Sequence, residues 1–141
     1  MGKLAYLHSK GRIDLNQEVT FKDLFNAGAL SKVPEGGVRL SEQGSEYLLK
    51  IGIPPRLEAS DASDEALQLI KEMNGTLIHR YRTPLILRQE LKPHKIKEHK
   101  FYKTPMPPQK DLLKMEKLRE RGFEVEYPRA PWFTDNIEKL K

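Results

Sequence analysis

The sequence predicts an α/β protein, with a small domain of short strands and helices followed by an extended, proline-rich and basic C-terminal arm. Three observations lead to this prediction. Apolar residues recur with helical and strand periods as far as residue 83, and prolines then recur at positions 84, 93, 105, 107 and 108. Positive charge is concentrated in the same later region. We therefore expect a compact domain over residues 1–83 and a largely extended extension over 84–141, with a short helix near 110–121.

The N-terminal part predicts two short helices. Residues 3–10 have apolar residues at helical spacing, and Gly11 is a natural end for that helix. Residues 12–18 read as a polar connector. Thr20 is placed to cap the next helix, which begins with a phenylalanine and ends at Gly28.

The next stretch predicts a two-stranded piece of sheet over residues 38–53. Residues 38–42 alternate apolar and polar side chains, as a half-buried strand does. Residues 46–53, EYLLKIGI, are more continuously apolar, so we expect them to form a buried strand. Pro54 ends this second run.

The best-defined pattern is a helix followed by a strand. Ser60 or Ser63 is placed to cap the helix, acidic residues occupy its first turn, and Asn74 with Gly75 closes it. Residues 76–82 then alternate as a strand does.

The later region carries weaker patterns. Residues 85–91 are apolar enough to pack on the domain, whereas 92–110 show no period. A short helix ends at Gly122, and residues 123–127 read as a strand. The final segment is expected to be extended, with Trp132 as an anchor and the last six residues either one helical turn or disordered.

The positive charge is unevenly distributed. The whole chain has a formal net charge of +5, but residues 79–121 hold 13 Lys and Arg against 5 Asp and Glu, a net of +8. Such asymmetry predicts a polyanionic partner, and the alternative is a lysine-rich face that is simply solvated. The candidate RNA-binding residues, which combine phosphate-neutralising cations with one ring for base stacking, are Arg80, Arg82, Arg88, Lys92, Lys95, Lys97, Lys100, Lys103 and Tyr102.

Several kinds of chemistry are disfavoured. The absence of cysteine excludes disulfides and thiolate metal sites. His94 and His99 are five residues apart, so on a helix they would face different directions, and the surrounding lysines would repel a divalent cation. Ser45 lacks the nucleophile-elbow context, and no phosphate-binding glycine loop is present. No apolar run is long enough to span a membrane. We therefore expect no catalytic residue, metal, cofactor or small-molecule substrate.

The stretch GVRLSEQGSEYLLKIGIPPRLEASDASDEALQLIKEMNGTLI resembles the C-terminal part of the large-subunit ribosomal protein 15 family. The family's glycine pair after the helix appears here as Asn74-Gly75. The opening KLAYLHSKGRID and the later PMPPQKDLLKMEKLRERGFEVEYP are similar to its mitochondrial branch. The family's long glycine- and arginine-rich N-terminal arm is not in this chain, so we expect the chain to be a C-terminal portion, or the arm to be encoded or lost elsewhere.

The resemblance implies a β-β-α unit and a structural role in the large subunit of the mitochondrial ribosome, in the mitochondrial matrix. It implies ribosomal RNA and neighbouring large-subunit proteins as partners, and no enzymatic activity. Two other classes stay open. One is a protein–protein adaptor whose basic arm wraps an acidic partner, and the other is a small hydrolase or transferase with a site assembled from distant residues.

Overall fold

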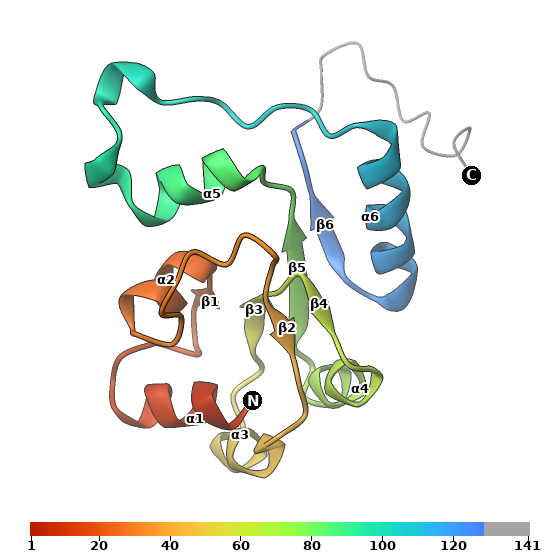
Figure 1. Ribbon diagram of the computed structural model, residues 1–141. Coiled ribbons are helices and arrows are strands. Elements are labelled where there is room, and N and C mark those ends of the chain that lie inside the picture. Colours follow the sequence, from red (N-terminus) through yellow and green to blue (C-terminus); the bar gives the residue numbers. More distant parts are fainter. Residues whose placement is uncertain (129–141) are drawn as a thin grey trace.

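The computed structural model describes residues 1–128, and its main sheet consists of four short parallel strands in the order β1-β3-β5-β6 (Figure 1). The register pairs Val19 with Leu57, Leu57 with Leu77, and Arg80 with Glu126. A second, two-stranded parallel sheet joins β2 to β4. The strands are β1 (Glu18–Val19), β2 (Arg39–Leu40), β3 (Arg56–Glu58), β4 (Asp61–Ala62), β5 (Thr76–Arg80) and β6 (Glu124–Glu126).

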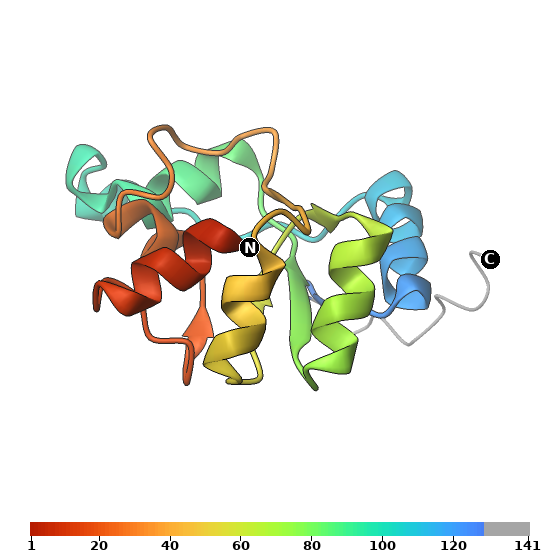
Figure 2. The ribbon, with the colours of Figure 1, turned by 90° about the horizontal axis from the view of Figure 1, so that it is seen from below.

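Six α-helices and two short 3-10 helices surround the strands of residues 1–128. Both views show α1, α3 and α4 in a row (Figures 1 and 2), and Figure 1 shows the chain crossing the top of the molecule before it reaches α6. The helices are α1 (Gly2–Ser9), α2 (Phe21–Asn26), α3 (Ser45–Ile51), α4 (Asp64–Glu72), α5 (Pro84–Leu91), η1 (Pro93–Lys95), η2 (Glu98–Lys100) and α6 (Gln109–Arg121). No helix in residues 1–128 has the length and apolar character that a membrane crossing requires.

Side-chain caps fix where three helices begin. Thr20 and Asp23 form a capping box, in which the Thr20 hydroxyl accepts from the Asp23 N–H at 3.3 Å and the carboxylate accepts from the Thr20 N–H at 3.0 Å. Ser63, one of the two predicted caps of α4, accepts from the Ala66 N–H at 3.2 Å. Thr83 caps α5 in the same way. Each such cap contributes about 1 kcal/mol.

The main core is an apolar cluster between the sheet and its helices. Leu48 of α3, Ile70 of α4 and Leu77 of β5 are almost fully buried in it. Residues from the later part of the chain join the same cluster, including Leu87 of α5 and Phe123 just before β6. Burial of each large aliphatic side chain contributes about 1.5–3 kcal/mol.

The predicted strand over residues 46–53 is wrong, because α3 occupies most of that stretch. Gly44 and Gly52, both in the left-handed region at φ 73° and 71°, bound the helix. Only Leu48 among the residues of α3 is fully buried, and Leu49 is exposed, as on one face of a helix. A short apolar run fits a helix and a buried strand equally well by period alone.

The predicted pairing within residues 38–53 is wrong for the same reason: β2 pairs with β4, not with its neighbour in sequence. The connector predicted at 12–18 contributes Glu18 to β1, and strands β3 and β4 follow Pro55 without a sequence signal of their own. Strands of two or three residues are too short to show an alternating pattern.

Residues after 83 pack closely on those before it. Within residues 84–128, strand β6 pairs with β5 in parallel, α5 contacts α2, and the stretch between η2 and α6 has no regular secondary structure. The division of the chain at residue 83 stays a prediction. Trp132 and the final six residues lie outside the described part of the chain.

Candidate nucleic-acid interface

Two of the predicted cations, Arg80 and Arg82, lie at the carboxyl end of β5. The Arg80 guanidinium pairs with Glu126 at 2.7 Å and also contacts Glu18. The Arg82 guanidinium pairs with Glu90 of α5 at 2.7 Å. Both arginines therefore bind carboxylates brought to this edge by β1, β6 and α5.

Glu58 of β3 lies at the centre of this arrangement. Its side chain is only 1% exposed and binds Arg82 and Arg80, the latter at 3.5 Å. It also accepts from the N–H of Phe21, the first residue of α2, at 3.2 Å. A buried carboxylate needs such partners because burying an unpaired charge is very unfavourable. We call Glu18, Glu58, Glu90, Glu126, Arg80 and Arg82 the arginine–glutamate cluster.

The arginine–glutamate cluster contains four carboxylates and two guanidinium groups, so its formal charge is −2. Each arginine is bound to at least two carboxylates. A phosphate would compete with these carboxylates for either arginine. The role of Arg80 and Arg82 as phosphate ligands stays a prediction, and their contacts here are structural.

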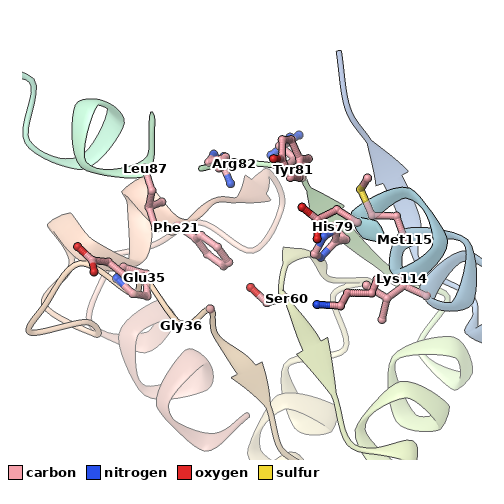
Figure 3. Close-up of a pocket in the computed structure, with 15 residues that line it drawn as sticks. Phe21, Glu35, Gly36, Ser60, His79, Tyr81, Arg82, Leu87, Lys114 and Met115 are labelled. Atoms are coloured by element: carbon pink, nitrogen blue, oxygen red, sulfur yellow. The ribbon is translucent and has the colours of Figure 1, made fainter. Parts of the chain in front are cut away.

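A cavity of about 350 Å³ opens beside this cluster, between the carboxyl edge of the sheet, the 34–37 turn and α6 (Figure 3). Its walls include His79, Ser60 and Lys114. The Ser60 hydroxyl accepts from the Val38 N–H at 3.2 Å, so it holds the chain before β2 in place. The cavity thus joins segments distant in sequence, and its serine is engaged in the fold.

The His79 imidazole is one of the titratable rings that line the cavity. Burial lowers the pKa of His79, and the nearby backbone groups of Ser60 and Ala59 act in the opposite direction. Its Nδ1 is buried without a hydrogen-bond partner among the described residues. The ring is therefore neutral near pH 7. Within residues 1–128, no three His, Asp or Glu side chains are grouped so as to hold a metal ion.

Five predicted lysines lie on one loop that leaves α5, and we call residues 92–103 the lysine loop. It contains η1 and η2, which give it two single turns instead of an open coil. Gln89 of α5 closes the loop: its amide donates to the Tyr102 carbonyl at 2.9 Å, and the Tyr102 N–H donates back at 2.7 Å. At the other end, the Lys92 ammonium lies 5.7 Å from the centre of the Phe25 ring.

The remaining lysines of this loop point to solvent. Lys95, Lys97, Lys100 and Lys103 are exposed, and none of them pairs with a carboxylate whose side chain the structure describes. The Tyr102 ring is 55% exposed, as a base-stacking group must be. The lysine loop therefore presents exposed cations together with an accessible ring.

Arg88, the last predicted cation, lies on α5 and forms an exposed pair with Glu35 at 2.6 Å. Such a pair is weak, about 0–1 kcal/mol, and a phosphate competes with it easily. The acidic partners of these arginines could not be predicted from the sequence. The parallel pairing of β5 with β6 places Arg80 opposite Glu126, and such a pairing has no local sequence pattern. Sequence reasoning also left out Lys110, Lys114 and Lys117, exposed along α6.

Comparison with known proteins places this geometry in context. The chain is 30% identical over 108 residues to "Large ribosomal subunit protein uL15m" of Schizosaccharomyces pombe, an alignment that covers 77% of the chain and 39% of that protein. It is 25% identical over 129 residues to the protein of the same name from Neurospora crassa, covering 92% of the chain and 39% of that protein. The chain thus spans about two fifths of the length of these relatives.

A family model described as ribosomal proteins 50S-L15, 50S-L18e and 60S-L27A matches residues 1–78. These residues contain α1 to α4 and β1 to β4, together with most of β5. The match therefore covers the four-helix, parallel-strand body and excludes the lysine loop. This chain belongs to the 50S-L15, 50S-L18e and 60S-L27A family of ribosomal proteins.

Proposed function

We propose that this chain is a structural component of the large subunit of the mitochondrial ribosome, in the mitochondrial matrix, and binds ribosomal RNA through the lysine loop. Family membership and two relatives named as mitochondrial large-subunit proteins support the ribosomal role. Ribosomal RNA and neighbouring large-subunit proteins are its partners, and it has no catalytic role and needs no cofactor.

The exposed cations of the lysine loop are the observation that supports RNA binding. Lys95, Lys97, Lys100 and Lys103 are exposed on a segment that the Gln89–Tyr102 hydrogen bonds join to α5. Exposed ammonium groups bind phosphates by displacing condensed counterions, and this needs no base-specific contact. The loop therefore binds through the RNA backbone, with Tyr102 available to stack on an unpaired base.

The test is the salt dependence of RNA affinity. Replacing Lys92, Lys95, Lys97 and Lys100 by glutamine should lower the slope of log K against log salt by about 0.7–0.9 for each phosphate that is no longer neutralised. A matched control replaces Lys22 and Lys32, exposed lysines outside the loop, and should change the slope little. An unchanged slope in the loop variant would refute phosphate binding by this loop.

A second measurement separates this function from the adaptor alternative. A tagged chain expressed in cells should sediment with the large mitochondrial subunit and be released when the RNA is digested. Recovery of the chain with an acidic protein after complete nuclease digestion would favour the adaptor role.

A further inference from the structure

A groove lies between α1 and α3, away from the lysine loop (Figure 1). Its volume is about 440 Å³, within the usual range for small-molecule sites of roughly 300–1,000 Å³. The residues that line it are Gly2, Ala5, Tyr6, Ser9, Tyr47 and Ile51. Its walls are mostly apolar, and none of its lining residues is acidic.

Close contact at one end of the two helices opens the groove at the other. The Gly2 N–H donates to the Gln43 carbonyl at 2.9 Å, and a Cβ on Gly44 would lie only 2.6 Å from Gly2 Cα. The first residue of α1 therefore touches the backbone just before α3. Figure 2 shows α1 and α3 beginning close together beside the N-terminus and then diverging. Small side chains such as Ala5 leave the space between them open.

Two tyrosines, one from each helix, line this space. Tyr6 of α1 is 58% exposed and Tyr47 of α3 is 57% exposed, unusually high values for large aromatic rings. An ammonium group lies over each ring, that of Lys10 at 5.8 Å from the Tyr6 centre and that of Lys50 at 5.8 Å from the Tyr47 centre. The groove thus has two accessible rings with a cation beside each.

The two rings and the two lysines together favour a nucleobase with its phosphate as the occupant of the groove. An accessible aromatic face binds a nucleobase by stacking, and a nearby lysine binds the adjoining phosphate. A second copy of the chain would bring Lys10 and Lys50 against their own counterparts, so like charges oppose self-association there. A partner helix would need a longer hydrophobic groove than these six lining residues form.

We propose that the groove binds one unpaired base of RNA, stacked on Tyr6 and Tyr47, while Lys10 and Lys50 contact the flanking phosphates. This inference rests on the proposed RNA-binding function and adds a second contact to it. The lysine loop supplies backbone binding of any RNA, and the groove supplies a preference for RNA with an extruded base.

The test uses the full chain and two RNA hairpins, one carrying a single unpaired 2-aminopurine and the other fully paired. Wild type should bind the bulged hairpin more tightly and quench the 2-aminopurine fluorescence by stacking. Tyr6→Leu and Tyr47→Leu should each weaken binding of the bulged hairpin about tenfold and leave the paired hairpin unaffected. Tyr6→Phe and Tyr47→Phe keep the rings and should retain the preference.

Controls exclude misfolding and general effects. Both tyrosines are exposed, so the leucine variants should keep the wild-type thermal unfolding midpoint, and Leu49→Ala on α3 outside the groove should bind as wild type does. Equal loss on both hairpins, or an unchanged preference in the leucine variants, overturns the proposal.

The two proposals fail in different ways. If the lysine-loop variant lowers the salt slope while the leucine variants keep the bulge preference, the groove proposal is overturned and the proposed function stands. If the chain binds neither hairpin, both are overturned. If the leucine variants keep their RNA affinity but lose association with a neighbouring protein, the groove is a protein contact and the proposal is overturned.

Discussion

Replacing Glu58 by glutamine should destabilise the fold far more than its location on a three-residue strand suggests. The buried carboxylate binds Arg80 and Arg82 and accepts from the N–H of Phe21 at 3.2 Å. Glutamine keeps the shape but removes the charge, which leaves the Arg82 side chain, 11% exposed, with Glu90 as its charged partner. Removing one partner of a buried pair costs about 3–5 kcal/mol, and the remaining carboxylates reduce this to roughly 2–3 kcal/mol.

Urea unfolding measures this change. With a slope of about 2–3 kcal/mol/M, the midpoint should fall by about 1 M in Glu58→Gln. The matched control is Glu126→Gln, which removes an Arg80 partner whose side chain is 52% exposed and should cost about 0–1 kcal/mol. Equal destabilisation by the two variants would refute the argument that burial, and not the number of ion pairs, makes Glu58 important.

A double-mutant cycle isolates the pair itself. The guanidinium carbon of Arg82 lies 5.6 Å from the centre of the Phe21 ring. Arg82→Met removes the guanidinium but keeps an apolar side chain next to that ring. The combined Glu58→Gln and Arg82→Met variant should be more stable than the sum of the two single changes predicts, by about 1–3 kcal/mol. Strict additivity would mean that the two side chains stabilise the fold independently.

Two further predictions concern the cavity and the lysine loop. Burial lowers the pKa of His79, so below about pH 6.5 the unfolded chain takes up a proton more readily than the folded chain does. The free energy of unfolding therefore decreases as the pH is lowered through this range. In His79→Gln, urea unfolding at several pH values should show a smaller decrease of the unfolding free energy at low pH than in wild type. An identical pH dependence in the two proteins would contradict this prediction. Gln89→Leu removes both hydrogen bonds to Tyr102 and should raise amide exchange in the lysine loop about tenfold. Unchanged exchange would show that other contacts hold the loop.

Elements with local signals were predictable. Helix α4 has a capping serine, acidic residues in its first turn and an asparagine–glycine stop, and each of these acts within a few residues of the chain. The capping box of Thr20 and Asp23 likewise marked the start of α2. For both helices the structure agrees with the sequence prediction because the determining interactions are local.

Elements without local signals were not predictable. Strands β1, β3 and β4 have two or three residues, and their partners lie between 20 and 40 positions away in the chain. Parallel pairing carries no turn signature, since a crossover joins the two strands. Helix α3 was mistaken for a strand because its bounding glycines, Gly44 and Gly52, act through backbone conformation and not through a hydrophobic period.

The candidate interface shows why counting charge along a segment overestimates the charge of a surface. Residues 79–103 have a net charge of +6 in the sequence. Their arginines pair with four carboxylates from outside the segment, which lowers the net charge of that region to +2; these are Glu18, Glu35, Glu58 and Glu126.

The two kinds of cation have different roles because their chemistry differs. The planar arginine fork suits desolvated carboxylates, and here Arg80 and Arg82 hold strands and helices together. The lysine ammonium is strongly hydrated and stays in solvent, and here Lys95, Lys97, Lys100 and Lys103 are exposed on the loop. Salt-dependent RNA binding should therefore follow the lysines of the loop, whereas changes to the two arginines should act first on stability.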